Sequence, residues 1–234
     1  MVQPLNGYRF SIDSLLLGRF ARARRRDRVL DLGAGCGVVG LLIAALGAPR
    51  EVVAIEIQPA LAACAAHSAA LNGPAIARAM RVLLGDLRAR RIAGITPASF
   101  DLVVANPPYR AAGRGRESPH PGRHIARGGA GATLAEFAAA AARYAANGAR
   151  VAMVFEAARS AELIATLVAH RLEPKRLRFV HPDRSAPAAT VLVEARKGGG
   201  VEVVIEPPII LYDRPGVYSG EARELMQDGS GVRK

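Results

Sequence analysis

The sequence predicts an α/β fold with a mostly parallel sheet and an antiparallel last strand. Seven short apolar runs have the length and composition of buried strands. Stretches with helical character separate most of these runs, and that alternation is typical of parallel strands joined by crossover helices. No helix separates the last two runs, so we expect that pair to run antiparallel.

The elements can be placed in order along the chain. The expected strands are 28–32, 51–55, 80–84, 100–105, 150–155, 176–181 and 189–194, and the expected helices are 37–46, 59–71, 133–146 and 160–170. Pro59 suits the first helical turn, where its missing N–H needs no partner, and Asn72-Gly73-Pro74 ends that helix. Pro107 and Pro108 end the fourth strand because proline cannot donate a hydrogen bond to a neighbouring strand.

We expect one main domain over residues 28–197, with an N-terminal extension over 1–27 and a C-terminal tail over 198–234. The tail opens with three glycines and continues with an apolar run and a Pro-rich, Tyr-containing segment. Residues 110–131 are rich in Gly, Pro, Arg and His, and they are too long and polar for an ordinary connection. We therefore expect a loop there that is shaped for a substrate.

Composition narrows the class of protein. The chain has 234 residues, of which half are hydrophobic, so it can bury a core without disulfides or metal. It contains no long uncharged apolar run, and its start does not resemble a signal peptide, so we expect no membrane span and a cytoplasmic location. The two cysteines, Cys36 and Cys64, form no C-x-x-C pair, which argues against a disulfide framework and a cysteine-built zinc site.

The net charge of +12 favours a polyanionic partner. All but three of the 32 basic residues are arginines in a chain rich in alanine and glycine, so coding bias is an alternative source of the charge. Six arginines lie within residues 19–28. This cluster is interpreted either as a solvent-exposed face or as a surface that contacts nucleic acid. Charge alone leaves a nucleic-acid partner open.

A glycine-rich segment, Asp31 to Gly37, lies where the first strand ends and a helix begins. Such glycines allow the backbone to approach a ligand closely. Gly35, Gly37 and Gly40 also fit the dinucleotide pattern G-x-G-x-x-G, with Glu56 ending the next strand, so a nicotinamide cofactor is one alternative. Asp31 would repel a pyrophosphate, however, and it suits a ligand with a cationic amino-acid part, such as S-adenosylmethionine.

The D-x-G-x-G-x-G spacing and the following acid resemble the motifs of Rossmann-like, seven-stranded class I methyltransferases. By that resemblance the loop lines the methionine part of the cofactor, Glu56 accepts from the ribose hydroxyls and Asp86 accepts from the adenine amine. Carboxylates are also common at strand ends simply because strands end at the surface. The candidate cofactor-binding residues are Asp31, Gly33, Ala34, Gly35, Cys36, Gly37, Glu56, Ile57, Asp86, Leu87 and Asn106.

The sequence Asn106-Pro107-Pro108-Tyr109 directly follows the fourth strand, at the edge where an open α/β sheet binds its ligands. The Asn106 side-chain oxygen and the Pro107 carbonyl can accept the two N–H groups of a planar amine, which aims the nitrogen lone pair at a methyl donor. Tyr109 offers a face for stacking a planar group. These four residues are the candidate catalytic residues, and they predict methylation of a planar nitrogen.

The N-P-P-Y motif is shared by adenine-N6, guanine-N2 and protein glutamine-N5 methyltransferases. The run from Gly7 to Leu17 (GYRFSIDSLLL) and the segment from Glu173 to Pro182 (EPKRLRFVHP) resemble the bacterial tRNA1(Val) adenine-N6 methyltransferase family. The resemblance covers nearly the whole chain and implies that residues 1–27 help to close over the cofactor.

The substrate is expected to contact the segment after the motif. The candidate substrate-binding residues are Tyr109, Arg110, Arg114, Arg116 and Arg123. Arginines there would position RNA through its phosphates. His120 and His124 have a zinc-like spacing, but the prolines around them oppose a helix and no third ligand is evident, so we expect no metal.

The combined expectation is an S-adenosylmethionine-dependent methyltransferase that acts on an exocyclic amine of a base, adenine N6 in tRNA. The alternatives are a protein glutamine-N5 methyltransferase, a ribosomal RNA guanine-N2 methyltransferase, a nicotinamide-dependent oxidoreductase and an inactive RNA-binding protein with this fold. The oligomeric state is not indicated by the sequence.

Overall fold

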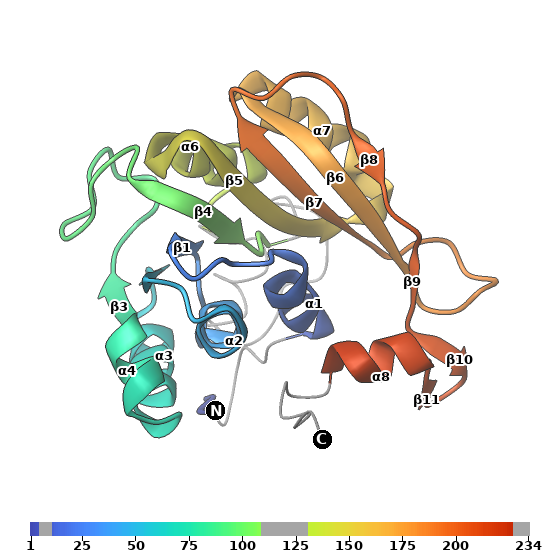
Figure 1. Ribbon diagram of the computed structural model, residues 1–234, viewed down its shortest axis with the longest axis horizontal. Coiled ribbons are helices and arrows are strands. Elements are labelled where there is room, and N and C mark those ends of the chain that lie inside the picture. The colour runs from blue at the N-terminus through green and yellow to red at the C-terminus, as the bar shows by residue number, and fades with distance from the viewer. Residues whose placement is uncertain (5–10, 109–130, 227–234) are drawn as a thin grey trace.

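A computed structural model describes residues 1–4, 11–108 and 131–226 (Figure 1). Its centre is a twisted sheet in the order β3-β2-β1-β4-β5-β7-β6-β8, with β9 also paired to β6. The strands of the main sheet are β1 (Arg28–Leu32), β2 (Glu51–Glu56), β3 (Met80–Leu84), β4 (Phe100–Ala105), β5 (Ala145–Glu156), β6 (Leu172–His181), β7 (Thr190–Lys197), β8 (Val204–Ile205) and β9 (Ile209–Ile210). The first five strands pair in parallel, and β7 runs antiparallel to both β5 and β6. The predicted mixed sheet with an antiparallel last strand is thereby confirmed.

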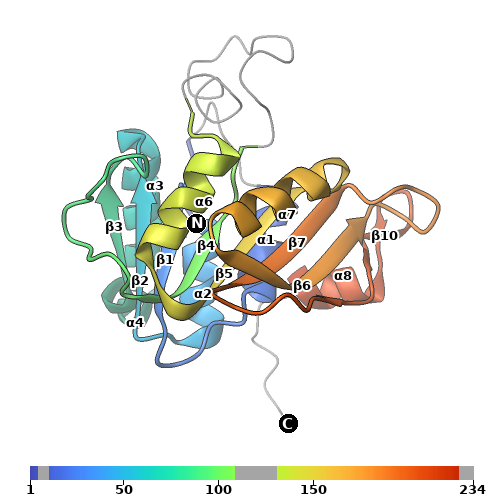
Figure 2. The same cartoon turned by 90° about the horizontal axis from the view of Figure 1, so that it is seen from above.

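Helices cover both faces of this sheet. They are α1 (Ile12–Phe20), α2 (Val38–Gly47), α3 (Pro59–Leu71), α4 (Pro74–Ala79), α6 (Leu134–Tyr144), α7 (Ser160–Ala169) and α8 (Gly220–Met226), with a short 3-10 turn, η1, at Ala157–Arg159. Figures 1 and 2 show α6 and α7 on one face and α1 and α2 on the other. Alternate residues of each central strand enter two separate apolar clusters, as Leu30 and Val29 do in β1. Both faces of the sheet are therefore buried, which explains the continuous apolar runs in the sequence.

Several features differ from the sequence-based expectations. Helices α1, α4 and α8 were not predicted, and β6 begins at Leu172 instead of Arg176. Strand β5 begins at Ala145 instead of Arg150 because Ala145 already pairs with Phe100 across a bulge. The segment after Lys197 contains short strands, including the hairpin of β10 (Tyr212–Arg214) and β11 (Val217–Tyr218). These elements are too short to produce a periodic signal, and they exist through their tertiary partners.

Helix α1 belongs to the core of the molecule. Leu16, Leu17 and Phe20 are buried in the apolar cluster that α2 shares with the sheet. Arg176 of β6 donates to the Phe20 carbonyl at 2.6 Å, and its guanidinium lies 4.0 Å from the centre of the Phe20 ring. The closing of residues 1–27 over a cofactor, and the division of the chain at residues 28 and 198, stay predictions.

Within the described residues, no helix combines the length and the apolar character that a membrane crossing requires. The same residues hold no cluster of three or more His, Cys, Asp or Glu side chains arranged to bind a metal ion.

Candidate active site

The candidate site residues come together at the carboxyl ends of four neighbouring parallel strands. The registers pair Leu32 with both Ile55 and Ala105, and Glu56 with Leu84. The glycine loop, the end of β2, the turn that holds Asp86, and Asn106 therefore follow adjacent strands at one edge of the sheet. This is the position at which open α/β sheets bind their ligands.

The loop from Gly33 to Gly37 has a backbone that favours glycine. Gly33, Gly35 and Gly37 all have positive φ, at 66°, 57° and 81°. A Cβ at Gly37 would lie 2.9 Å from the Ala65 Cβ, and one at Gly33 would lie 3.0 Å from the Phe137 ring. Any side chain at these two positions would therefore be strained and crowded. The conformation leads directly into α2, for which Gly37 is the N-terminal cap.

Glu56 anchors this loop. Its Oε2 accepts a hydrogen bond from the Gly35 N–H at 2.8 Å, and its Oε1 accepts from the Gln58 N–H at 2.9 Å. The carboxylate is buried, so these hydrogen bonds hold the turn after β1 and the turn after β2 in a fixed position relative to each other. This contact to Gly35 was not predicted. Each carboxylate oxygen keeps a second lone pair, so the predicted acceptor role toward a ribose stays open.

Asp31 lies beneath the loop, at the end of β1. It is 1 % exposed, and its Oδ2 accepts from the Gly40 N–H of α2 at 3.0 Å. Burial raises the pKa of Asp31 to about 7; the Gly40 hydrogen bond lowers it in part, and the negative charge of Glu56 raises it. Asp31 therefore exchanges a proton close to neutral pH, which is unusual for a carboxyl group.

Replacing Asp31 by asparagine is expected to remove part of the pH dependence of stability. Because the folded-state pKa of about 7 exceeds the ordinary value of 3.8, folded protein holds a proton that the unfolded chain releases. The free energy of unfolding of the wild type should therefore fall, relative to that of Asp31→Asn, as the pH rises from the ordinary pKa of 3.8 to the folded-state pKa of about 7. Urea denaturation of both proteins without cofactor measures the difference, and a difference that does not change with pH would contradict the assignment.

The remaining residues predicted to bind the cofactor differ in burial and in contacts; they are Asp86, Ile57 and Leu87. Asp86 is half-buried and pairs with Arg88, whose Nη2 lies 2.7 Å from its Oδ2, and this contact holds the pKa of Asp86 below its usual range. Ile57 is exposed at the end of β2, whereas the Leu87 side chain is buried in the core. Asp86 is thus a charged hydrogen-bond acceptor at the edge, whereas the side chain of Leu87 belongs to the core.

Cys36 and the start of the N-P-P-Y motif lie at the same edge. Burial raises the pKa of the Cys36 thiol to about 11, so it remains protonated and is unsuited to act as a nucleophile. Asn106 is half-buried, and its Nδ2 donates to the Ser14 Oγ of α1 at 3.1 Å. Pro107 is buried and Pro108 half-buried after it. Tyr109, Arg110, Arg114, Arg116 and Arg123 lie outside the described residues.

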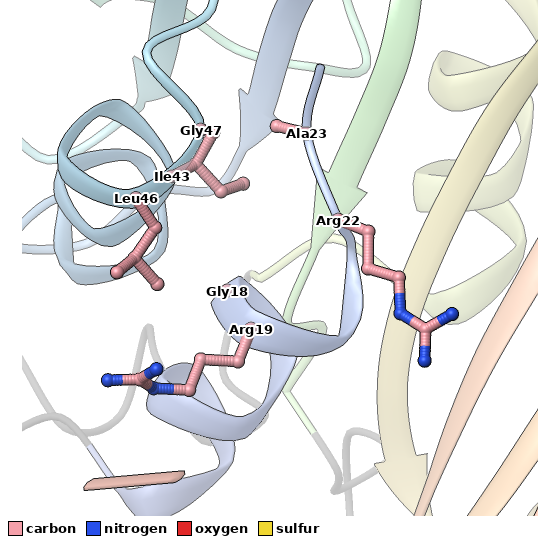
Figure 3. Close-up of a pocket in the computed structure, with 7 residues that line it drawn as sticks. All are labelled: Gly18, Arg19, Arg22, Ala23, Ile43, Leu46 and Gly47. Atoms are coloured by element: carbon pink, nitrogen blue, oxygen red, sulfur yellow. The ribbon is translucent and has the colours of Figure 1, made fainter. Parts of the chain in front are cut away.

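Two further groups are remote from this edge. Figure 3 shows a hollow between the C-terminal parts of α1 and α2, at the end of α2 opposite to the glycine loop; it is lined by Gly18, Arg19, Arg22, Ala23, Ile43, Leu46 and Gly47. The arginines of residues 24–26 are exposed before β1, at the amino ends of the strands. Neither group lies beside the predicted cofactor edge.

Comparisons with known proteins identify the family and the fold of the chain. Residues 11–120 match the family model of the methyltransferase small domain. Over 214 residues the chain is 30% identical to the tRNA1(Val) (adenine(37)-N6)-methyltransferase of Aeromonas hydrophila, covering 91% of this chain and 86% of that protein. The enzyme of the same name from Yersinia pestis (strain Pestoides F) is 34% identical over 100 residues, which is 42% of this chain and 39% of that protein.

Solved structures share the fold. A predicted O-methyltransferase from Agrobacterium tumefaciens superposes with a TM-score of 0.74 at 24% identity, covering 91% of this chain and 94% of that one. The geranyl diphosphate C-methyltransferase of Streptomyces coelicolor A3(2) reaches a TM-score of 0.58 at 12% identity, over 80% of each chain. These likenesses concern the fold alone.

The fold and the family match define an S-adenosylmethionine-dependent methyltransferase, so the nicotinamide alternative is wrong. The chain belongs to the family of the bacterial tRNA1(Val) adenine-N6 methyltransferases. The residues present fit the cofactor of this class, because a glycine loop with positive φ at Gly33, Gly35 and Gly37 adjoins acids at the ends of β1 and β2. When bound, S-adenosylmethionine supplies an electrophilic methyl group on a sulfonium.

Proposed function

We propose that this methyltransferase acts on an exocyclic amino group of a nucleic-acid base, adenine N6 in tRNA. The observation that carries the proposal is the position of Asn106 and Pro107 directly after β4, next to the glycine loop that follows β1 in the paired register. The family membership supports the same substrate class, since the Aeromonas relative is named for adenine-N6 methylation of a tRNA. A cytoplasmic location stays a prediction.

The residues at this edge can activate an amine without a strong base. The nitrogen of an aromatic amine is a weak nucleophile because its lone pair is delocalised into the ring. If the Asn106 Oδ1 and the Pro107 carbonyl accept the two N–H groups, the nitrogen is favoured in tetrahedral form and its lone pair points at the donor side of the site. One proton then leaves for solvent after transfer. The contribution of the chain is positioning and hydrogen-bond polarisation.

The remaining roles follow from the chemistry of each group. We propose that the Gly33–Gly37 backbone lines the methionine part of the cofactor, with Ile57 and the Leu87 backbone flanking the adenine. Glu56 would accept from the ribose and Asp86 from the adenine amine. Tyr109 would stack on the target base, and Arg110, Arg114, Arg116 and Arg123 would contact phosphates.

Asp31 is expected to make cofactor affinity depend on pH. A cationic amino group near the buried carboxyl would favour the ionised form and release the proton that Asp31 holds below about pH 7. The affinity for S-adenosylhomocysteine should therefore rise as the pH increases from about 6 to about 8, and Asp31→Asn should flatten this rise. Isothermal titration calorimetry between about pH 6 and about pH 8 measures the affinity of both proteins. An affinity that changes with pH by the same factor in the wild type and in Asp31→Asn would refute the proposed role of Asp31.

The identity of the methylated product tests the proposed function. The protein is incubated with labelled S-adenosylmethionine and, in separate reactions, with tRNA and with ribosomal RNA from a strain of its source organism that lacks the gene, and each RNA is digested to nucleosides. We expect label in N6-methyladenosine. Label only in N2-methylguanosine of ribosomal RNA, or only in a release factor added in parallel, would replace the adenine assignment with one of the alternatives.

A further inference from the structure

The hydrogen bond between Ser14 and Asn106 joins two parts of the chain that are 92 residues apart. Ser14 lies in the first turn of α1 and is 3 % exposed, so its hydroxyl is shielded from water. The donor is the Asn106 Nδ2 and the acceptor is the Ser14 Oγ, at 3.1 Å. The contact occupies one end of the Asn106 amide, and within the described part of the chain no hydrogen bond engages the other end, Oδ1.

The orientation of this amide matters for the proposed chemistry, on which this inference rests. An asparagine amide has a donor end and an acceptor end of nearly the same shape. Rotation of the amide by half a turn would present the NH₂ group to the substrate amine, and two donors cannot form a hydrogen bond. Only the orientation with Nδ2 toward α1 leaves Oδ1 free to accept from the substrate.

We propose that Ser14 is a positioning residue that holds Asn106 in this productive orientation. In this structure the Ser14 Oγ accepts from the Asn106 Nδ2, so the amide is bound by its donor end. This hydrogen bond opposes rotation of the amide and keeps Oδ1 on the other side. Ser14 acts through Asn106 and needs no contact with the substrate.

The first turn of α1 is itself held in place. Asp13 accepts from Ser11 Oγ at 2.9 Å and from Thr190 Oγ1, at the start of β7, at 3.3 Å. Further along, a Cβ at Gly18 would lie 2.9 Å from the Leu42 Cδ2, which shows how closely α1 packs on α2. These contacts fix the hydroxyl of Ser14 relative to the end of β4. The N-terminal segment thereby takes part in ordering the catalytic edge.

The test compares Ser14→Ala, Ser14→Thr, Asn106→Ala and the double variant Ser14→Ala/Asn106→Ala. Initial rates are measured with saturating S-adenosylmethionine and tRNA from the deletion strain. Loss of one buried hydrogen bond is expected to lower the kcat of Ser14→Ala by about tenfold, with KM for tRNA and the Kd for S-adenosylhomocysteine changed by less than about twofold. Ser14→Thr keeps a hydroxyl and should recover most of the rate. The double variant should be no slower than Asn106→Ala, because Ser14 acts only through Asn106.

A matched control is Ser219→Ala, which removes another buried hydroxyl; this one donates to the Ile210 carbonyl at 2.6 Å and accepts from the Ala222 N–H at 3.0 Å. It should leave kcat unchanged, and thermal melting of every variant reports on folding. If Ser14→Ala keeps the wild-type kcat while Asn106→Ala loses it, or if the two losses add in the double variant, the positioning role is overturned. If Asn106→Ala itself keeps the wild-type kcat, the proposed function fails instead.

Discussion

Replacing Asn106 by alanine is expected to lower kcat for methyl transfer by about 10² to 10³-fold, the usual cost of removing one polarising hydrogen-bond partner at a reacting group. The variant loses Oδ1, which we propose accepts one N–H of the substrate amine. It keeps the glycine loop and its Glu56 anchor, which do not involve Asn106. The Kd for S-adenosylhomocysteine should therefore change by less than about threefold. Single-turnover rates and calorimetric binding measure the two quantities separately.

Asn72→Ala is a suitable control for this experiment. Asn72 is the C-terminal cap of α3, where its Nδ2 donates to the Ser68 carbonyl at 2.7 Å, so it is an asparagine with a structural bond away from the candidate site. Its loss should change the melting temperature and leave kcat unchanged. An Asn106→Ala protein that turns over at the wild-type rate would end the proposed mechanism. Equal losses in both asparagine variants would indicate a general effect on folding.

Replacing Arg150 by alanine is expected to destabilise the protein by about 3 to 5 kcal/mol, because it leaves a buried charge without its partner. The Arg150 Nη2 lies 2.5 Å from the Asp27 Oδ2, and these side chains are 14% and 10% exposed. The other nitrogen, Nη1, donates to the carbonyls of Ala21 at 3.2 Å and Arg22 at 3.0 Å. One strand side chain thus ties the segment after α1 to the middle of the sheet.

Urea denaturation followed by circular dichroism measures this effect as a shift of the midpoint at constant m-value. Arg25→Ala removes an exposed arginine of the neighbouring cluster and should stay within about 0.5 kcal/mol of the wild type. The double variant Arg150→Met/Asp27→Leu removes both charges and should recover much of the loss. A loss below about 1 kcal/mol for Arg150→Ala would show that solvent screens this pair as it screens surface ion pairs.

Several elements were predictable from the sequence because their signals are local. The bounds of β1, β3 and β4 agree with the expected strands, since a strand buried on both faces is a continuous apolar run that ends at a polar residue, a glycine or a proline. Helix α3 also has its expected bounds, because Pro59 at its start and Asn72-Gly73 at its end act within one turn.

Other elements gave no such signal. The apolar residues of α1 form a short run beside Gly18, and no side chain caps the start of the helix, so the sequence of this segment does not predict a helix. The segment is helical because it packs on α2 and the sheet. Helix α4 follows directly after the Gly73 that ends α3, and its six residues include no buried side chain. The tail strands have two or three residues each, and they depend on partners such as β6.

The sequence by itself determined the α/β class, the glycine loop with its acids, and the Asn-Pro-Pro motif after β4, because each of these depends on residues that are close together in the chain. Only the tertiary structure decided that Glu56 holds the loop through Gly35, that Ser14 binds the Asn106 amide, and that Arg150 holds the segment after α1. The last two contacts span 92 and 129 residues. Their partners meet only after the helices have packed on the sheet, so nothing in the neighbouring sequence marks them.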